Sequence, residues 1–127
     1  MLDINPDTVC RLVELARIFH AREEVVIPEE PNDPSGDWPT QILADHAGDS
    51  TLAEFRGIIT DLEPDQQQQV VALLWMGRGD FALDEWDDAV RQAAENWSEN
   101  TADYLIAHPM LPDYLSDALD QHGYSCP

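Results

Sequence analysis

The turn Gly77-Arg78-Gly79-Asp80-Phe81 carries the residues of this chain that are best placed to do chemistry. It sets a guanidinium and a carboxylate close together, between glycines that allow the backbone to turn sharply. The chain has 6 basic residues, all of them arginine, against 26 acidic ones. Arg78 is therefore expected either to pair with a carboxylate or to hold an anion. Tryptophan and arginine are also enriched at binding hot spots. The predicted interaction or ligand site comprises Trp75, Gly77, Arg78, Gly79, Asp80, Phe81, Glu85 and Trp86.

Part of this stretch is similar to a calcium-binding loop. From Gly79 to Trp86 the order of glycine, apolar residue, glutamate and aromatic residue matches the second half of an EF-hand loop. The three leading ligand positions would be Leu74, Met76 and Arg78. None of these supplies a carboxylate, so we expect an EF-hand-like helix–turn–helix around residues 64–97 at most, without calcium.

The sequence gives little support to catalytic or metal-binding sites elsewhere in the chain. The absence of lysine excludes a Walker lysine and Schiff-base catalysis. No HxxxH or CxxC spacing occurs, so neither a metal site nor a cofactor is predicted, and no catalytic residue is assigned. Cys10 and Cys126 are too few and too far apart to suggest a secreted disulfide scaffold. Cys10 is expected to be a buried, inert thiol.

The charge of the chain restricts its partners. The formal net charge is −20, which would repel nucleic acid and anionic lipid, so the expected partner is a basic or neutral protein. No apolar run is long enough for a membrane helix, and the N-terminus lacks the features of a signal peptide. We therefore expect a cytoplasmic location.

Helical periodicity dominates wherever the apolar residues recur regularly. Helices are predicted near residues 6–24, 50–62, 64–76, 84–97, 101–106 and 111–122, with a short turn over 39–45. Four prolines in 28–39 exclude helix there, and an exposed acidic, proline-rich loop is expected over 27–38. The tail 124–127 is expected to fray. The predicted fold is a single all-α domain spanning 1–127, an orthogonal bundle of five to six short helices. The helix predicted over 64–76 is apolar on nearly every side from Val70 to Met76 and is therefore expected at the centre of the core. Either Gly77 or Gly79 is expected to provide its left-handed C-terminal cap.

With these segments in place, the chain resembles a small bacterial family, domain of unknown function 3775. The most specific shared stretch is Leu74-Trp75-Met76-Gly77-Arg78-Gly79-Asp80-Phe81. Softer matches are Leu2-Asp3-Ile4-Asn5-Pro6, Ala16-Arg17, Asp61-Leu62, Asp65-Gln66, Glu85-Trp86, Thr101-Ala102-Asp103-Tyr104-Leu105, Pro109 and Tyr114-Leu115. The resemblance implies a bacterial protein in which the loop 27–38 is a variable insertion. It implies no activity and no functional residues.

The sequence leaves three possible functions open, the third of which is suggested by charge alone. The leading expectation is a non-catalytic interaction or regulatory module that acts through protein–protein contact, with a homodimer also allowed. The second is a small-ligand or metal-binding protein with a pocket near the Gly77–Phe81 turn. The third is an acidic mimic of nucleic acid, whose carboxylates would imitate phosphates. An enzyme is the less favoured class.

Overall fold

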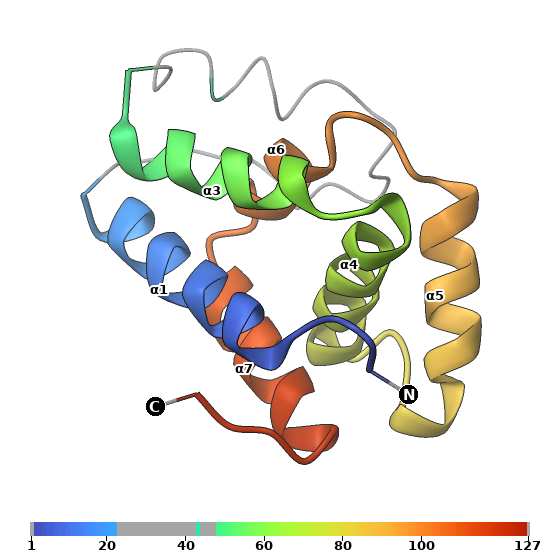
Figure 1. Cartoon of the computed structure of the whole chain (residues 1–127). Coiled ribbons are helices and arrows are strands. Elements are labelled where there is room, and N and C mark those ends of the chain that lie inside the picture. The colour runs from blue at the N-terminus through green and yellow to red at the C-terminus, as the bar shows by residue number, and fades with distance from the viewer. Residues whose placement is uncertain (1, 23–42, 44–47, 127) are drawn as a thin grey trace.

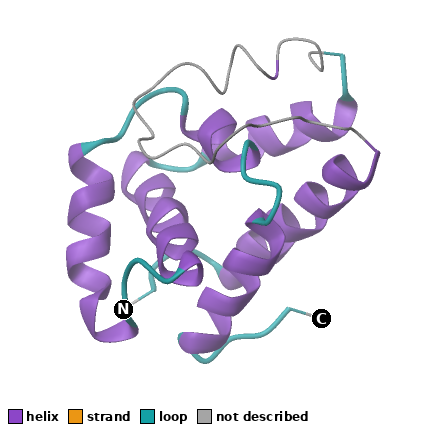
Figure 2. Cartoon of the chain, turned by 180° about the vertical axis from the view of Figure 1, so that it is seen from behind, coloured by secondary structure: helices purple, strands orange, loops and turns teal. Residues whose placement is uncertain are grey.

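The computed structural model describes residues 2–22, 43 and 48–126, and these form a bundle of helices (Figure 1). Its elements are α1 (Pro6–Arg22), α3 (Ser50–Asp61), α4 (Pro64–Arg78), the 3-10 turn η2 (Leu83–Glu85), α5 (Trp86–Glu95), α6 (Thr101–Ile106) and α7 (Leu111–Gln121). No strand occurs in these ranges (Figure 2), so the prediction of an all-α bundle is confirmed. The predicted loop 27–38 lies outside the described residues, as does the turn 39–45 apart from Leu43.

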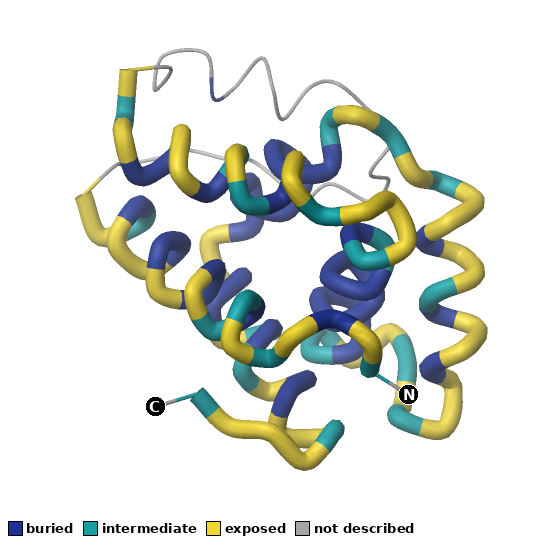
Figure 3. Tube along the Cα trace, in the orientation of Figure 1, coloured by how far each residue is buried: buried dark blue, intermediate teal, exposed yellow. Residues whose placement is uncertain are grey.

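Helix α4 is the central element of the bundle. It packs against α5, α6 and α7, while α1 packs against α3 and α7. Every residue from 70 to 76 is buried, which Figure 3 shows as a dark blue stretch. A helix that is apolar on all sides requires neighbours on all sides, and α4 has them. The sequence pattern predicted this central place.

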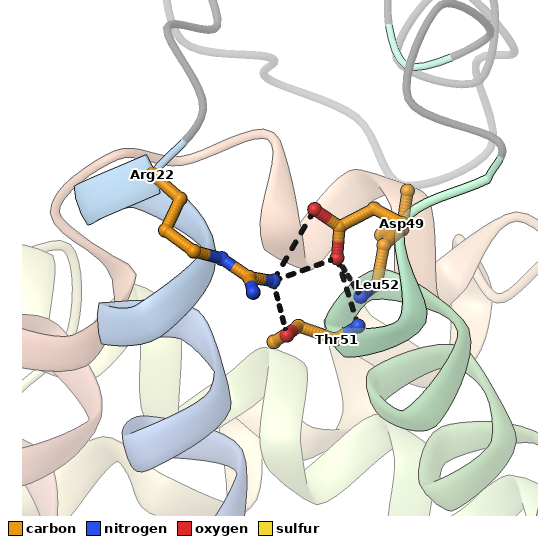
Figure 4. A network of polar contacts seen from close by, with 4 residues as sticks. All are labelled: Arg22, Asp49, Thr51 and Leu52. Carbon is orange, nitrogen blue, oxygen red and sulfur yellow. Dashed lines mark hydrogen bonds and ion pairs between the residues drawn. The ribbon is translucent and has the colours of Figure 1, made fainter.

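The end of α1 is joined to the start of α3 by a polar network (Figure 4). One Asp49 carboxylate oxygen accepts the backbone N–H groups of Thr51 and Leu52, at 2.8 and 3.0 Å, and so caps α3. The Arg22 guanidinium, at the last residue of α1, donates to both carboxylate oxygens of Asp49, at 3.2 and 3.4 Å, and to the Thr51 hydroxyl. The Asp49 side chain is only 6% exposed, so this network fixes one helix end against the other.

The C-terminal tail differs from the sequence-based expectation. Gly123 adopts a left-handed backbone, and the Tyr124 N–H donates to the Leu119 carbonyl at 2.9 Å. Cys126 then forms a disulfide with Cys10 in α1, with 5.5 Å between their Cα atoms. The prediction that Cys10 is an inert thiol was wrong, and residues 124–126 are tied down, whereas the sequence predicts fraying. Spacing could not reveal this pair because 116 residues separate its members.

None of the helices in the described ranges is both long and apolar enough to cross a membrane.

Candidate interaction site

The turn after α4 is built on Gly79. This glycine has a φ of 98°, in the left-handed region that glycine adopts without strain. Its N–H donates to the Met76 carbonyl at 3.1 Å, and the N–H of Asp80 donates to the Trp75 carbonyl at 2.9 Å. These bonds satisfy carbonyls that the end of a helix leaves open. Of the two glycines expected to cap α4, Gly79 does so.

Arg78 is committed to partners within the protein. Its Nε and Nη2 donate to the same Asp80 carboxylate oxygen, at 2.9 and 2.7 Å. Its Nη1 lies 3.2 Å from Nε2 of His108, a residue that is fully buried. The Arg78 side chain is 18% exposed. Of the two alternatives for this guanidinium, the structure shows the ion pair.

The contacts of His108 determine which ring nitrogen carries its proton. Nδ1 lies 2.9 Å from the Tyr104 carbonyl oxygen, which can only accept a hydrogen bond, so Nδ1 must be the donor. Nε2 then presents a lone pair to the Arg78 N–H in the neutral ring. This arrangement leaves neither nitrogen directed to solvent as a base.

An aromatic cluster adjoins this polar network. The Trp75 indole N–H donates to the Tyr104 hydroxyl oxygen at 2.8 Å, and both residues are buried. Phe81 stacks on Trp75 with 6.0 Å between ring centroids. Burial raises the pKa of Tyr104 above its usual value, which favours the neutral hydroxyl. The Trp75–Tyr104 bond joins α4 to α6, and Arg78 joins the end of α4 to His108, just after α6. The other two predicted site residues of this group support these links, since Phe81 packs on Trp75 and Asp80 pairs with Arg78.

The other predicted site residues lie apart from this network. A Cβ atom on Gly77 would overlap the Tyr114 carbonyl oxygen and lie 2.7 Å from the Tyr114 Cα, so Gly77 is where α4 approaches α7. Trp86 is buried, with its ring 4.5 Å from that of His122. The Glu85 carboxylate accepts the Ala82 N–H at 2.9 Å. This bond closes the η2 turn. Glu85 is the residue that would be a calcium ligand in the EF-hand comparison.

No group of three or more histidine, cysteine, aspartate or glutamate side chains converges within the described residues as a metal site would require. His20, which has metal-pair spacing to Glu24 in the sequence, instead lies with its Nε2 2.8 Å from the Ile106 carbonyl oxygen. Glu24 lies outside the described ranges.

An open groove that the sequence analysis did not identify lies where α3 meets α4, opposite the link between α5 and α6. It has a volume of about 570 Å³. Its lining residues are Ile59, Thr60, Asp61, Leu62, Glu63, Pro64, Gln67, Trp97, Glu99 and Ala102. We call this feature the Trp97 groove. It includes none of the predicted site residues.

Trp97 is hydrogen-bonded within this groove while part of the residue stays exposed. Its indole N–H donates to the Gln67 side-chain oxygen at 2.9 Å, and the Gln67 amide donates to the Leu62 carbonyl at 3.1 Å. Gln67 is buried, whereas Trp97 is 37% exposed. The sequence pattern placed Trp97 on the apolar stripe of a helix reaching residue 97, but α5 ends at Glu95. Trp97 is therefore in the link, which explains its exposure.

The rim of the Trp97 groove is acidic. Asp61, Glu63 and Glu99 are all exposed. None of the three forms an ion pair with any residue of the described ranges. The nearest arginine along α3, Arg56, is instead paired with Asp103 at 2.6 Å. The groove thus combines several apolar lining residues with carboxylates that have no cationic partner within this part of the protein.

A second hollow, of about 580 Å³, lies beside the disulfide. Its lining residues are Asp7, Cys10, Arg11, Val13, Glu14, Arg17, Ile18 and Cys126. Like the Trp97 groove, it includes no residue of the Gly77–Phe81 turn.

Comparison with known proteins identifies one family. The model of a family described as "Protein of unknown function (DUF3775)" matches residues 52–124, more than half of the chain. The matched range contains α4, the Gly77–Phe81 turn and the Trp97 groove, and it begins after α1. No curated protein and no solved structure matches the chain.

Proposed function

Because the chain belongs to the DUF3775 family, whose description carries no activity, we propose its function from its surface: a non-catalytic module that binds a basic polypeptide segment in the Trp97 groove. The observation that carries this proposal is a hydrogen-bonded, partly exposed indole in a groove that is also lined by three carboxylates without ion-pair partners among the described residues. The module would act in a bacterial cytoplasm by contact with its partner.

The chemistry of the groove favours arginine or lysine side chains as its occupants. Their aliphatic stems can pack on the apolar lining residues while the cation lies against the indole face or a rim carboxylate. Trp97 is already ordered by Gln67, so binding loses little side-chain entropy there. An exposed, preordered tryptophan is also a frequent hot-spot residue.

Charge selects the kind of partner. The net charge of −20 attracts a basic segment over long range and opposes an acidic one. A second copy of this chain would bring the same charge to the groove, so the groove is proposed for a different, basic protein. The Arg78 guanidinium and the Asp80 carboxylate of the Gly77–Phe81 turn pair with each other, and Arg78 also contacts the buried His108, which is why the ligand-pocket alternative near that turn is not carried forward.

The cytoplasmic location forms part of this proposal and has a consequence for the disulfide. Cytoplasmic disulfides are usually transient. The Cys10–Cys126 bond would therefore be made and broken during the life of the protein. Trapping thiols at the moment of lysis, in cells that make the protein natively, measures its redox state.

The binding proposal is tested by calorimetric titration of the full chain with a short arginine-rich peptide that also contains leucine. A matched pair of variants separates the groove from the general charge: Asp61→Asn, Glu63→Gln and Glu99→Gln together, against Asp87→Asn, Glu95→Gln and Asp120→Asn together. Both sets remove the same charge, and only the first lines the groove. We expect the groove set to weaken binding at least about tenfold, because it removes charges that contact the peptide. The control set removes distant charges and should weaken binding less than about threefold. Equal losses in both sets would show non-specific attraction and overturn the proposal.

A further inference from the structure

The disulfide lies at the molecular surface, beside the second hollow. The hollow is lined by both Cys10 and Cys126, and each of these residues is only partly buried. Its volume of about 580 Å³ is ample for a small organic thiol. A disulfide that serves only to hold a core together has no need of such an approach route.

Both ends of the disulfide are secured to the bundle by other contacts. Helix α1 is held by a row of buried residues: Val9, Leu12, Val13, Leu15, Ala16 and Phe19. On the other side, the hydrogen bond from Tyr124 to Leu119 closes α7 before the cysteine is reached. Cleaving the disulfide would therefore release only the short segment that follows Tyr124. The helices would keep their packing.

We propose that Cys10–Cys126 is a thiol–disulfide exchange site for small neutral or cationic thiols, and that exchange frees and restores the C-terminal tail. The attacked sulfur is Sγ of Cys126, because the backbone is anchored at Tyr124 and the one residue between them, Ser125, is exposed, so Cys126 can move away with the small thiol once the disulfide breaks. Cys10 lies within α1, whose buried residues hold the helix against the bundle, which suits this sulfur to remain in place as the leaving group.

The exchange runs in two balanced steps. The thiolate of the small molecule forms a bond to Sγ of Cys126, the Cys10–Cys126 bond breaks, and Cys10 leaves as a thiolate that takes a proton from water. A second thiolate attacks the small-molecule sulfur of this mixed disulfide and releases Cys126 as a thiolate, which is also protonated. The protein disulfide gains two electrons, and two small thiols become one small disulfide. The reverse sequence re-forms the bond.

The charges around the hollow explain the class of thiol. Asp7 and Glu14 offset Arg11 and Arg17 among the lining residues. The Arg11 cation is also engaged by Glu54 of α3, so the hollow offers an anion no local excess of positive charge. The net charge of −20 then dominates and repels an anionic thiol more than a neutral or cationic one.

The test reduces the oxidised full chain under native conditions with cysteamine, 2-mercaptoethanol or reduced glutathione, which are cationic, neutral and anionic probes. Free thiols are counted by alkylation and mass spectrometry, and rates are compared per thiolate at low and high salt. We expect two thiols to appear well before global unfolding, with the helical circular dichroism retained and the melting temperature lowered. At low salt the rate of disulfide reduction should be highest with cysteamine, lower with 2-mercaptoethanol and lowest with glutathione. At high salt the differences between these three rates should become smaller. Reduction only at the rate of global unfolding, or equal rates for all probes at low salt, would overturn the proposal.

A pair of single variants tests which sulfur is attacked. Cys10→Ser leaves Cys126 free, and Cys126→Ser leaves Cys10 free. With a small neutral disulfide as reagent, the mixed disulfide should form faster on Cys126 than on Cys10. Faster reaction at Cys10 would contradict the assignment. The double variant should keep the native helical signal, and its loss would show that the disulfide is required for folding.

Discussion

A Cβ atom placed on Gly77 would overlap the carbonyl oxygen of Tyr114, so α4 and α7 pack at their observed separation only because residue 77 has no side chain. The obstacle is backbone, which cannot rotate away as a flexible side chain could. We predict that Gly77→Ala lowers the free energy of unfolding by about 1–3 kcal/mol, the usual cost of overpacking a core. Urea denaturation followed by circular dichroism measures it.

Gly57 in α3 provides the matched control. An added Cβ there meets nothing within 4 Å, and the residue also lies inside a helix. Gly57→Ala should therefore raise the free energy of unfolding by about 0.5–1 kcal/mol, because alanine is the better helix former. If both alanine variants changed stability in the same direction, the close approach of α4 and α7 at Gly77 would be refuted.

The Arg22–Asp49 network at the start of α3 predicts an order of stability losses for three variants. Asp49→Ala removes both the cap and the partner of Arg22, and should cost about 1–2 kcal/mol of unfolding free energy. Asp49→Asn keeps a capping oxygen and should cost less. Arg22→Ala should cost at most about 1 kcal/mol, because that side chain is half exposed and solvent screens its charge. Chemical denaturation of the three variants gives the order, and a larger loss for Arg22→Ala than for Asp49→Ala would contradict it.

Two partly buried histidines should make stability depend on pH. Burial lowers the pKa of His20 and of His122 below the usual value in the folded state. The unfolded chain therefore binds protons first as the pH falls below about 6.5, so the stabilising contribution is complete above that pH and is lost progressively below it. The variant His20→Gln with His122→Gln should show a flatter decline in melting temperature between neutral and mildly acidic pH. A decline as steep as in the native chain would argue against these two residues as its source.

Salt should stabilise the protein. A net charge of −20 produces self-repulsion that is weaker in the expanded unfolded chain than in the folded one, and ions screen it. We predict a rise in melting temperature from low to moderate ionic strength with sodium chloride. A fall over that range would mean that the ion pairs, such as Arg56–Asp103, outweigh the repulsion.

The residues predicted most successfully were those whose structure depends on near neighbours in the chain. Gly79 ends α4 through bonds to Trp75 and Met76, and the continuous apolar run in α4 was enough to place that helix centrally. Trp97 was assigned to the wrong element because periodicity cannot locate the end of α5 within a few residues.

Contacts between distant segments could not be predicted in this way. The Arg78 side chain reaches His108, 30 residues away, and Cys10 reaches Cys126 across nearly the whole chain. Local sequence patterns cannot reveal such pairings, because the pairings depend on how the helices pack. The same limit hid the Trp97 groove, which joins the α3–α4 corner to the link before α6.

The central claim, that a basic segment binds at Trp97, is tested most directly by the indole N–H signals of the tryptophans in a proton–nitrogen correlation spectrum. Trp97→Phe assigns the signal of interest, and the arginine-rich peptide is then added to the native chain. We predict that the Trp97 indole signal shifts with peptide concentration while those of the buried Trp75 and Trp86 stay in place. A peptide that binds without shifting the Trp97 signal, or that shifts the buried tryptophans instead, would contradict the account.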